Sequence, residues 1–308
     1  MPSEKPLKIC LATSEMAPLA KTGGLADVTS ALTAYLDSKG HDVRLLMPFY
    51  ASIEEGALEI ESVPQLQDME MEIDGRTVHF WIVRARLVPG HPWIYLLQCP
   101  ELFSGQQLYG GDDEHIRFAF LSRVAIESCQ RMQWSPHVIH CNDWHTGLLP
   151  LYLRTTYGWD RLFSETRTLL TIHNIGYQGT FPASALEDLG LMAQRRHLAQ
   201  DDVNRGVINF MKTGLMHADA LSTVSRTYAQ EIQDSELGMG LEGVLRQRRH
   251  ALTGIVNGVD YSEWDPATDA LIPHSFSADD LAGKAENKRD LLEDFGLDVE
   301  MGAPLFGI

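Results

Sequence analysis

The chain has 308 residues and a formal net charge of −17, from 25 Lys and Arg against 42 Asp and Glu. This acidic balance argues against a nucleic-acid-binding protein, because binding to phosphates needs clustered Lys and Arg. The composition is that of a globular protein of about two domains, and no apolar run reaches the ~18 residues of a transmembrane helix, so we expect no membrane partner.

The first 47 residues have the pattern of a strand, a helix and a second strand. Residues 8–13 form a short apolar run, and residues 25–38 carry apolar side chains at helical spacing before Gly40. Residues 43–47 (VRLLM) read as the next strand, which stops at Pro48. This order predicts a parallel sheet with a right-handed crossover.

The pattern changes between residues 58 and 98. Residues 69–73 alternate between apolar and polar, Asp74-Gly75 is a hairpin signal, and residues 77–83 and 93–97 read as two more strands. We therefore expect a β-meander that extends the sheet.

Helices and strands alternate through the rest of the chain. We expect helices over residues 118–131, 148–156, 207–216 and 226–233, and strands over 137–140, 167–172, 220–224 and 252–256. The fold class is therefore α/β, with a Rossmann-like parallel-sheet domain.

The end of the sequence predicts a charged helix over residues 279–295, with Ser277 as its N-cap. Residues 305–308 read as the start of a buried strand. A buried strand needs neighbours on both sides, so we expect this chain to be part of a longer protein.

The four cysteines lie far apart and form no C-x-x-C pair, which argues against a disulfide framework or a zinc ribbon. Cys10 and Cys99 lie in apolar runs, so we expect them to be buried. No signal peptide is visible, and the cysteine usage favours a reducing compartment, so we expect a cytoplasmic protein.

Polar loops follow three of the predicted strands. The first contains Lys21, Gly23 and Gly24 before a helix, which suits a phosphate or a sugar hydroxyl. An ordinary glycine turn with a surface lysine fits the same residues. The loop matches neither a dinucleotide fingerprint nor a P-loop.

The second loop, residues 140–145, is rich in His, Asn and Asp, and the third, residues 171–179, contains His, Asn, Tyr and Gln. The second lacks the spacing of a metal site, so we expect no metal; a hydrogen-bonding site and a buried polar loop both remain open. The third, with His173, Asn174 and Tyr177, suits an uncharged polyol, although a loop histidine that caps a helix is the alternative. All three loops are expected at one edge of the sheet, where ligands bind in such folds.

Seven motifs, taken in order, resemble bacterial glycogen synthase and plant starch synthase. They are residues 21–25 (KTGGL), 109–113 (YGGDD), 140–145 (HCNDWH), 173–179 (HNIGYQG), 223–225 (TVS), 238–243 (GMGLEG) and 256–268 (VNGVDYSEWDPAT). This resemblance implies the N-terminal half of a two-domain GT-B glycosyltransferase, which transfers glucose from ADP-glucose to the non-reducing end of an α-1,4-glucan with retention. It implies no cofactor, since ADP-glucose is the donor substrate.

The resemblance also implies roles for residues in this sequence. Lys21, Gly23 and Gly24 match the residues near the donor, Asp143 an aspartate that faces the acceptor, and His173 the histidine near the transferred glucose. We take His173 and Asp143 as catalytic. We add Asn174, Tyr109 and Tyr177 as substrate-binding residues, and Trp144 as a further aromatic near the cleft. Cys141 and Arg226 depart from the usual alanine and proline.

The implied domains are an acceptor-side catalytic domain over residues 1–250, a linker over 251–300, and the first strand of a C-terminal nucleotide-binding domain over 301–308. That missing domain supplies an Arg, a Lys and a Glu in the family, so we expect this chain alone to be inactive. Two alternatives remain: a stand-alone glucan-binding module, and a retaining transferase for another sugar nucleotide.

Overall fold

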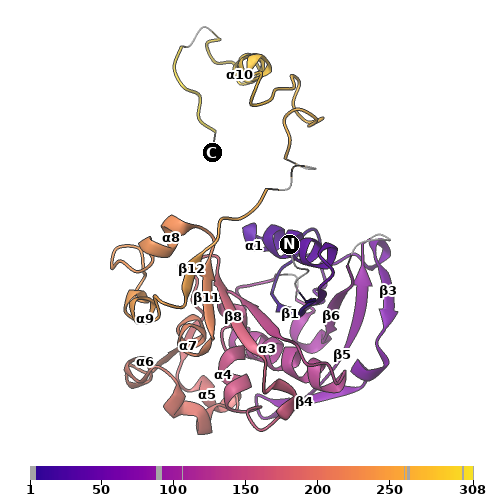
Figure 1. Ribbon diagram of the computed structural model, residues 1–308, viewed down its shortest axis with the longest axis vertical. Coiled ribbons are helices and arrows are strands. Elements are labelled where there is room, and N and C mark those ends of the chain that lie inside the picture. The colour runs from indigo at the N-terminus through magenta and orange to yellow at the C-terminus, as the bar shows by residue number, and fades with distance from the viewer. Residues whose placement is uncertain are drawn as a thin grey trace. The chain divides into compact units, whose positions relative to one another are not determined.

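The computed structural model describes residues 5–87, 92–105, 107–259, 261, 264–299 and 302–307 (Figure 1). It contains two compact units, one ending at Asn257 and the other beginning at Gly258. The boundaries at residues 250 and 300 stay predictions. No helix in the described part of the chain is both long and apolar enough to span a bilayer.

A mixed sheet forms the centre of the first unit. Its strands are β1 (Lys8–Ala12), β2 (Asp42–Pro48), β3 (Glu59–Ser62), β4 (Met69–Ile73), β5 (Arg76–Arg86), β6 (Ile94–Gln98), β7 (Val138–Asn142), β8 (Arg167–Ile172), β11 (Ala220–Thr223) and β12 (Leu252–Gly254). The run β12-β11-β8-β7-β1-β2-β6 is parallel throughout. Strand β5 continues it in antiparallel pairing with β6, and both β3 and β4 pair with β5. The predicted α/β class with a meander extension is therefore confirmed.

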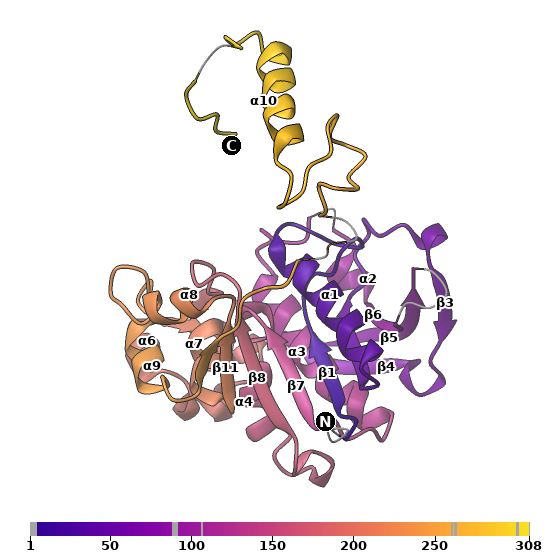
Figure 2. The same cartoon turned by 45° about the horizontal axis from the view of Figure 1, so that its top comes forward.

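The helices of this unit are α1 (Gly24–Ser38), α2 (Pro100–Phe103), α3 (Glu114–Arg131), α4 (Leu149–Arg154), α5 (Ala185–Asp188), α6 (Gln200–Asn204), α7 (Phe210–His217), α8 (Arg226–Glu231) and α9 (Glu242–Gln247). Helix α1 covers one face of the sheet, and α3, α4 and α7 pack against one another on the other face (Figure 2). Because both faces are covered, Leu11 and Ile139 in the central strands have no exposed surface. The cysteines, Cys10 and Cys99 included, are buried and free, as expected for those two.

The structure differs from the expectation for residues 207–216. Residues 207–216 are not one helix: Val207–Asn209 is strand β10, which pairs with β9 (Thr180–Pro182), and α7 begins after Asn209, whose side chain caps it. Strand β3 had no clear sequence signal, because none of its residues is buried.

The second unit begins at Gly258 and contains helix α10 (Ala282–Asp294). Ser277 is not its N-cap; the Ser277 hydroxyl instead accepts the backbone N–H groups of Asp279 and Asp280 in the preceding turn. Residues 305–307 form no strand, and Ile308 lies outside the described residues. A strand needs a pairing partner, which this segment lacks within the described part of the chain.

Candidate functional site

The three predicted loops meet at the carboxyl edge of the sheet. They follow β1, β7 and β8, which are neighbours in the order β8-β7-β1. Two strand spacings separate the first from the last, about 10 Å. This edge therefore gathers Lys21, Asp143 and His173, as the sequence predicted.

Asp143 is held by its backbone conformation and by two hydrogen bonds. It lies directly after β7 with a φ of 53°, in the left-handed region that few non-glycine residues adopt. Its Oδ1 accepts the backbone N–H of His173 at 2.8 Å and that of Asn174 at 3.4 Å, so it fixes the start of the third loop. Burial raises the pKa of Asp143 from 3.8 to about 7; the two N–H groups lower it and Glu15 raises it further.

His173 is held in one tautomer by Asn142. The Asn142 Nδ2 donates to the Ala12 carbonyl at 3.1 Å, so its Oδ1 is left to accept a hydrogen bond from His173 Nε2 at 2.9 Å. Burial lowers the pKa of His173 to about 4, so the ring is neutral at pH 7. It then carries its proton on Nε2 and presents an unprotonated Nδ1.

The loop before α1 combines an exposed cation with open space. Lys21 forms an ion pair with Asp27 at 2.7 Å, and its side chain is 48% exposed. A Cβ added to Gly23 or Gly24 would meet nothing within 4 Å, and neither residue has a positive φ. The fold of this unit therefore requires glycine at neither position.

The three aromatic residues expected near the cleft differ in how exposed they are. Tyr177 is 69% exposed and available for stacking on a ligand. Tyr109 is half-buried, and its hydroxyl bonds to Ser14 and Glu15 inside the protein. Trp144 is buried, so it cannot stack on a glucan, and Gly179 (φ +61°) lies so close that a Cβ there would be 2.1 Å from its ring. Asn174 is exposed, and its Oδ1 accepts the N–H of Gly176 at 2.9 Å.

His140 and His145 form a buried polar loop. His140 Nε2 lies 2.6 Å from Thr171 Oγ1, and the His145 ring stacks on Tyr109 at 4.7 Å. Burial lowers the pKa of His140 to about 4 and that of His145 to about 3. Within the described ranges, no three His, Cys, Asp or Glu side chains are grouped as a metal site would require.

Comparison with known proteins now identifies the family. A family model described as the starch synthase catalytic domain matches residues 8–247. The chain belongs to this family.

Its relatives within the starch synthase family are close. The chain is 41% identical to a glycogen synthase of Geotalea daltonii, and the match covers 98% of this chain and 62% of the relative. It is 40% identical to a glycogen synthase of Moorella thermoacetica, and that match covers 99% of this chain and 61% of the relative. The solved catalytic domain of starch synthase IV from Arabidopsis thaliana, bound to ADP and acarbose, matches with a TM-score of 0.82 and 32% identity, over 97% of this chain and 61% of that one. The chain thus spans about three fifths of the length of these relatives.

Two residues at the carboxyl edge of the sheet were not predicted from the sequence. Asn142 orients His173, and Glu15, which is 3% exposed, accepts hydrogen bonds from the Lys21-Thr22-Gly23 turn. Glu15 offered one signal, since it is a carboxylate close after a buried strand and is followed by the apolar residues 16–20. Such a group must find partners inside the protein.

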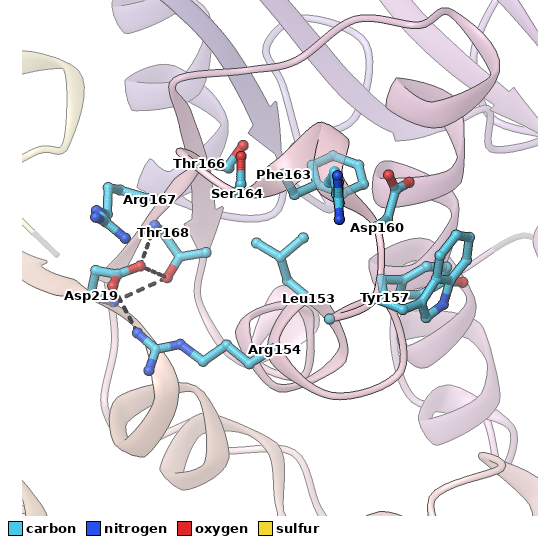
Figure 3. Close-up of a pocket in the computed structure, with 13 residues that line it drawn as sticks. Leu153, Arg154, Tyr157, Asp160, Phe163, Ser164, Thr166, Arg167, Thr168 and Asp219 are labelled. Carbon is cyan, nitrogen blue, oxygen red and sulfur yellow. Dashed lines mark hydrogen bonds and ion pairs between the residues drawn. The ribbon is translucent and has the colours of Figure 1, made fainter.

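A cavity of about 520 Å³ lies at the other end of the sheet, where β8 and β11 begin (Figure 3). Leu153 and Phe163 contribute apolar walls, and Arg154 and Asp219 form an ion pair at 2.7 Å beside them. None of the predicted site residues lines this cavity. The polar residues predicted for the site therefore lie at the carboxyl edge and not beside this cavity.

Proposed function

We propose that this chain is the N-terminal part of a glycogen or starch synthase, which transfers glucose from ADP-glucose to the non-reducing end of an α-1,4-glucan with retention. The observation that carries this proposal is the convergence of the KTGGL, HCNDWH and HNIGYQG loops at one sheet edge. Family membership supports it, as does the ADP in the related starch synthase IV.

The donor is proposed to bind at the loop before α1. Gly23 and Gly24 leave open space there, and the first N–H groups of α1 have no partner within the helix. With Lys21 they can stabilise the charge that develops on a diphosphate leaving group. Because a diphosphate leaves readily, no acidic carboxyl pair is required.

The transferred glucose is proposed to lie against His173, with Asn174 and Tyr177 as further sugar contacts. The neutral ring of His173 offers Nδ1 as a hydrogen-bond acceptor for a sugar hydroxyl. Asp143 holds the backbone of His173 and Asn174 and is proposed to face the acceptor. Tyr109 is half-buried with its hydroxyl engaged, so we assign it a supporting role at the donor loop.

The remaining catalytic groups are proposed to come from a second, nucleotide-binding domain, to which residues 251–300 lead. Closure of two domains would exclude water and prevent hydrolysis of the donor. We place the enzyme in the cytoplasm, because its four thiols are free.

The test is an assay of the full-length enzyme with glycogen and either ADP-glucose or UDP-glucose. We expect glucose transfer from ADP-glucose, and Lys21→Ala lowers the rate about 100-fold, the effect of removing one charged contact to a transition state. Glycogen binding without transfer would favour a stand-alone glucan-binding module. Preference for UDP-glucose would favour a transferase for another sugar nucleotide.

A further inference from the structure

The buried carboxylate of Glu15 organises the turn that precedes α1. Its Oε2 accepts the backbone N–H of Thr22 at 2.6 Å and that of Gly23 at 3.4 Å, and its Oε1 accepts the Thr22 hydroxyl at 2.7 Å. Gly23 is the N-cap of α1 and has no side chain to cap it. Glu15 therefore supplies from outside the helix the negative group that a helix N-terminus favours.

The same carboxylate reaches a second loop through Tyr109. The Tyr109 hydroxyl donates to Glu15 Oε1 at 2.5 Å, which leaves Ser14 Oγ, at 2.7 Å, to donate to Tyr109. Burial raises the pKa of Tyr109 far above its usual range, so the phenol keeps its proton and remains a donor. The Tyr109 ring in turn stacks on His145 of the loop after β7. Glu15 thus joins three loops that are far apart in the sequence.

The arrangement divides the N–H groups of the turn into two sets. Glu15 occupies those of Thr22 and Gly23, so these are directed into the protein. The N–H groups that remain for a ligand begin at Gly24, the first residue of α1.

We propose that Glu15 is a positioning residue for the sugar-nucleotide donor. It fixes the Lys21-Thr22-Gly23 turn so that Lys21 and the start of α1 face the diphosphate, and it ties this turn to the Tyr109 loop. The proposal rests on the proposed function, because it assigns the donor to this turn.

The test compares Glu15→Gln, Glu15→Ala and Thr22→Val in the full-length enzyme. Glutamine keeps the shape and one acceptor for the Thr22 N–H, but replaces the second oxygen by a donor. We expect kcat/KM for ADP-glucose to fall about tenfold in Glu15→Gln and Thr22→Val, and about 100-fold or more in Glu15→Ala. The KM for glycogen stays within twofold, because the acceptor does not touch this turn.

A matched control is Thr33→Val, which removes another buried hydrogen bond of α1, from Thr33 Oγ1 to the Thr29 carbonyl at 2.7 Å. It lowers the melting temperature without changing the KM for ADP-glucose. If Glu15→Gln and Glu15→Ala also change only the melting temperature, the positioning role is overturned.

Amide hydrogen exchange separates this proposal from the proposed function. The N–H groups of Thr22 and Gly23 should exchange faster in Glu15→Ala than in the wild type or Thr33→Val, whether or not the enzyme transfers glucose. Wild-type inactivity with ADP-glucose would defeat the proposed function and, with it, the donor role of Glu15. Unchanged exchange in an active enzyme would defeat the positioning role alone.

Discussion

The two ends of the parallel sheet hold their carboxylates in opposite ways. At the carboxyl edge, Asp143 and Glu15 are buried: Asp143 accepts backbone N–H groups, and Glu15 accepts backbone N–H groups and the hydroxyls of Thr22 and Tyr109. At the amino edge, Asp219 is partly exposed and pairs with Arg154 at 2.7 Å. Burial of a carboxylate costs stability, whereas the partly exposed ion pair contributes to it modestly. An arrangement that costs stability is typical of a functional site.

The largest expected difference between the two ends concerns two histidines. His173→Ala at the carboxyl edge should lower kcat about 100-fold or more, because it removes the proposed contact to the transferred glucose, and should change glycogen binding less. The matched variant is His137→Ala at the amino edge, where the His137 ring accepts the N–H of Lys8 at 2.9 Å. That variant should lose about 1 kcal/mol of stability and keep its kcat. Loss of glycogen binding with normal kcat in His173→Ala would contradict the assigned role.

Replacing aspartate by asparagine should change stability in opposite directions at the two edges. Between pH 3.8 and about 7, native Asp143 keeps a proton that the unfolded chain has released, so the wild type loses stability as the pH rises through this window. Asparagine keeps the Oδ1 acceptor, tolerates the positive φ and does not titrate. Asp143→Asn should therefore be more stable than the wild type at pH 8, by roughly 2–4 kcal/mol, and equal to it near pH 3.5.

The counterpart is Asp219→Asn, which weakens bonds to Arg154 and to the N–H and hydroxyl of Thr168. It should destabilise the chain by about 1–2 kcal/mol at pH 8. Urea unfolding of both variants at the two pH values measures these effects. A gain for Asp219→Asn, or a loss for Asp143→Asn at pH 8, would remove the contrast between the two edges.

A smaller effect is expected from a single methyl group at Gly24. Gly24→Ala meets nothing within 4 Å and should stabilise α1 by about 0.5–1 kcal/mol, yet raise the KM for ADP-glucose about tenfold. Gly56→Ala is the control, since its added Cβ also meets open space, far along the chain from the three loops. Steady-state kinetics and melting temperatures distinguish the two. An unchanged KM in Gly24→Ala would place the donor elsewhere.

The smallest effect is expected at the amino-edge cavity. Trp159 is 74% exposed on its rim, and Trp159→Ala should change stability by less than about 0.5 kcal/mol and leave kcat/KM within twofold. The same kinetic assay, extended to glycogen of increasing concentration, measures this. A clear rise in the KM for glycogen would mean that the cavity contacts the acceptor. Both edges of the sheet would then take part in function.

The pattern of the sequence was sufficient for most of the fold. Apolar runs in β1, β7 and β8 and the 3.6-residue spacing in α1 and α3 are strong signals, because buried elements need long apolar faces. Strand β3 lacked such a signal, and the expected helix over residues 207–216 concealed the short strand β10. Short elements at the surface depend on pairing partners that are distant in sequence, which local patterns do not contain.

The sequence by itself determined which loops carry the polar residues, because the order of strands and helices sends those loops to one edge of a parallel sheet. Only the tertiary structure decided how each side chain is used. It buried Trp144, turned the hydroxyl of Tyr109 inward to Glu15, and placed Asn142 where it orients His173. The last two outcomes depend on hydrogen bonds between residues 30 or more positions apart, Glu15–Tyr109 and Asn142–His173, and the burial of Trp144 depends on ring contacts with Phe118, Phe181 and Phe210. Residue type and local spacing determine neither their partners nor their burial.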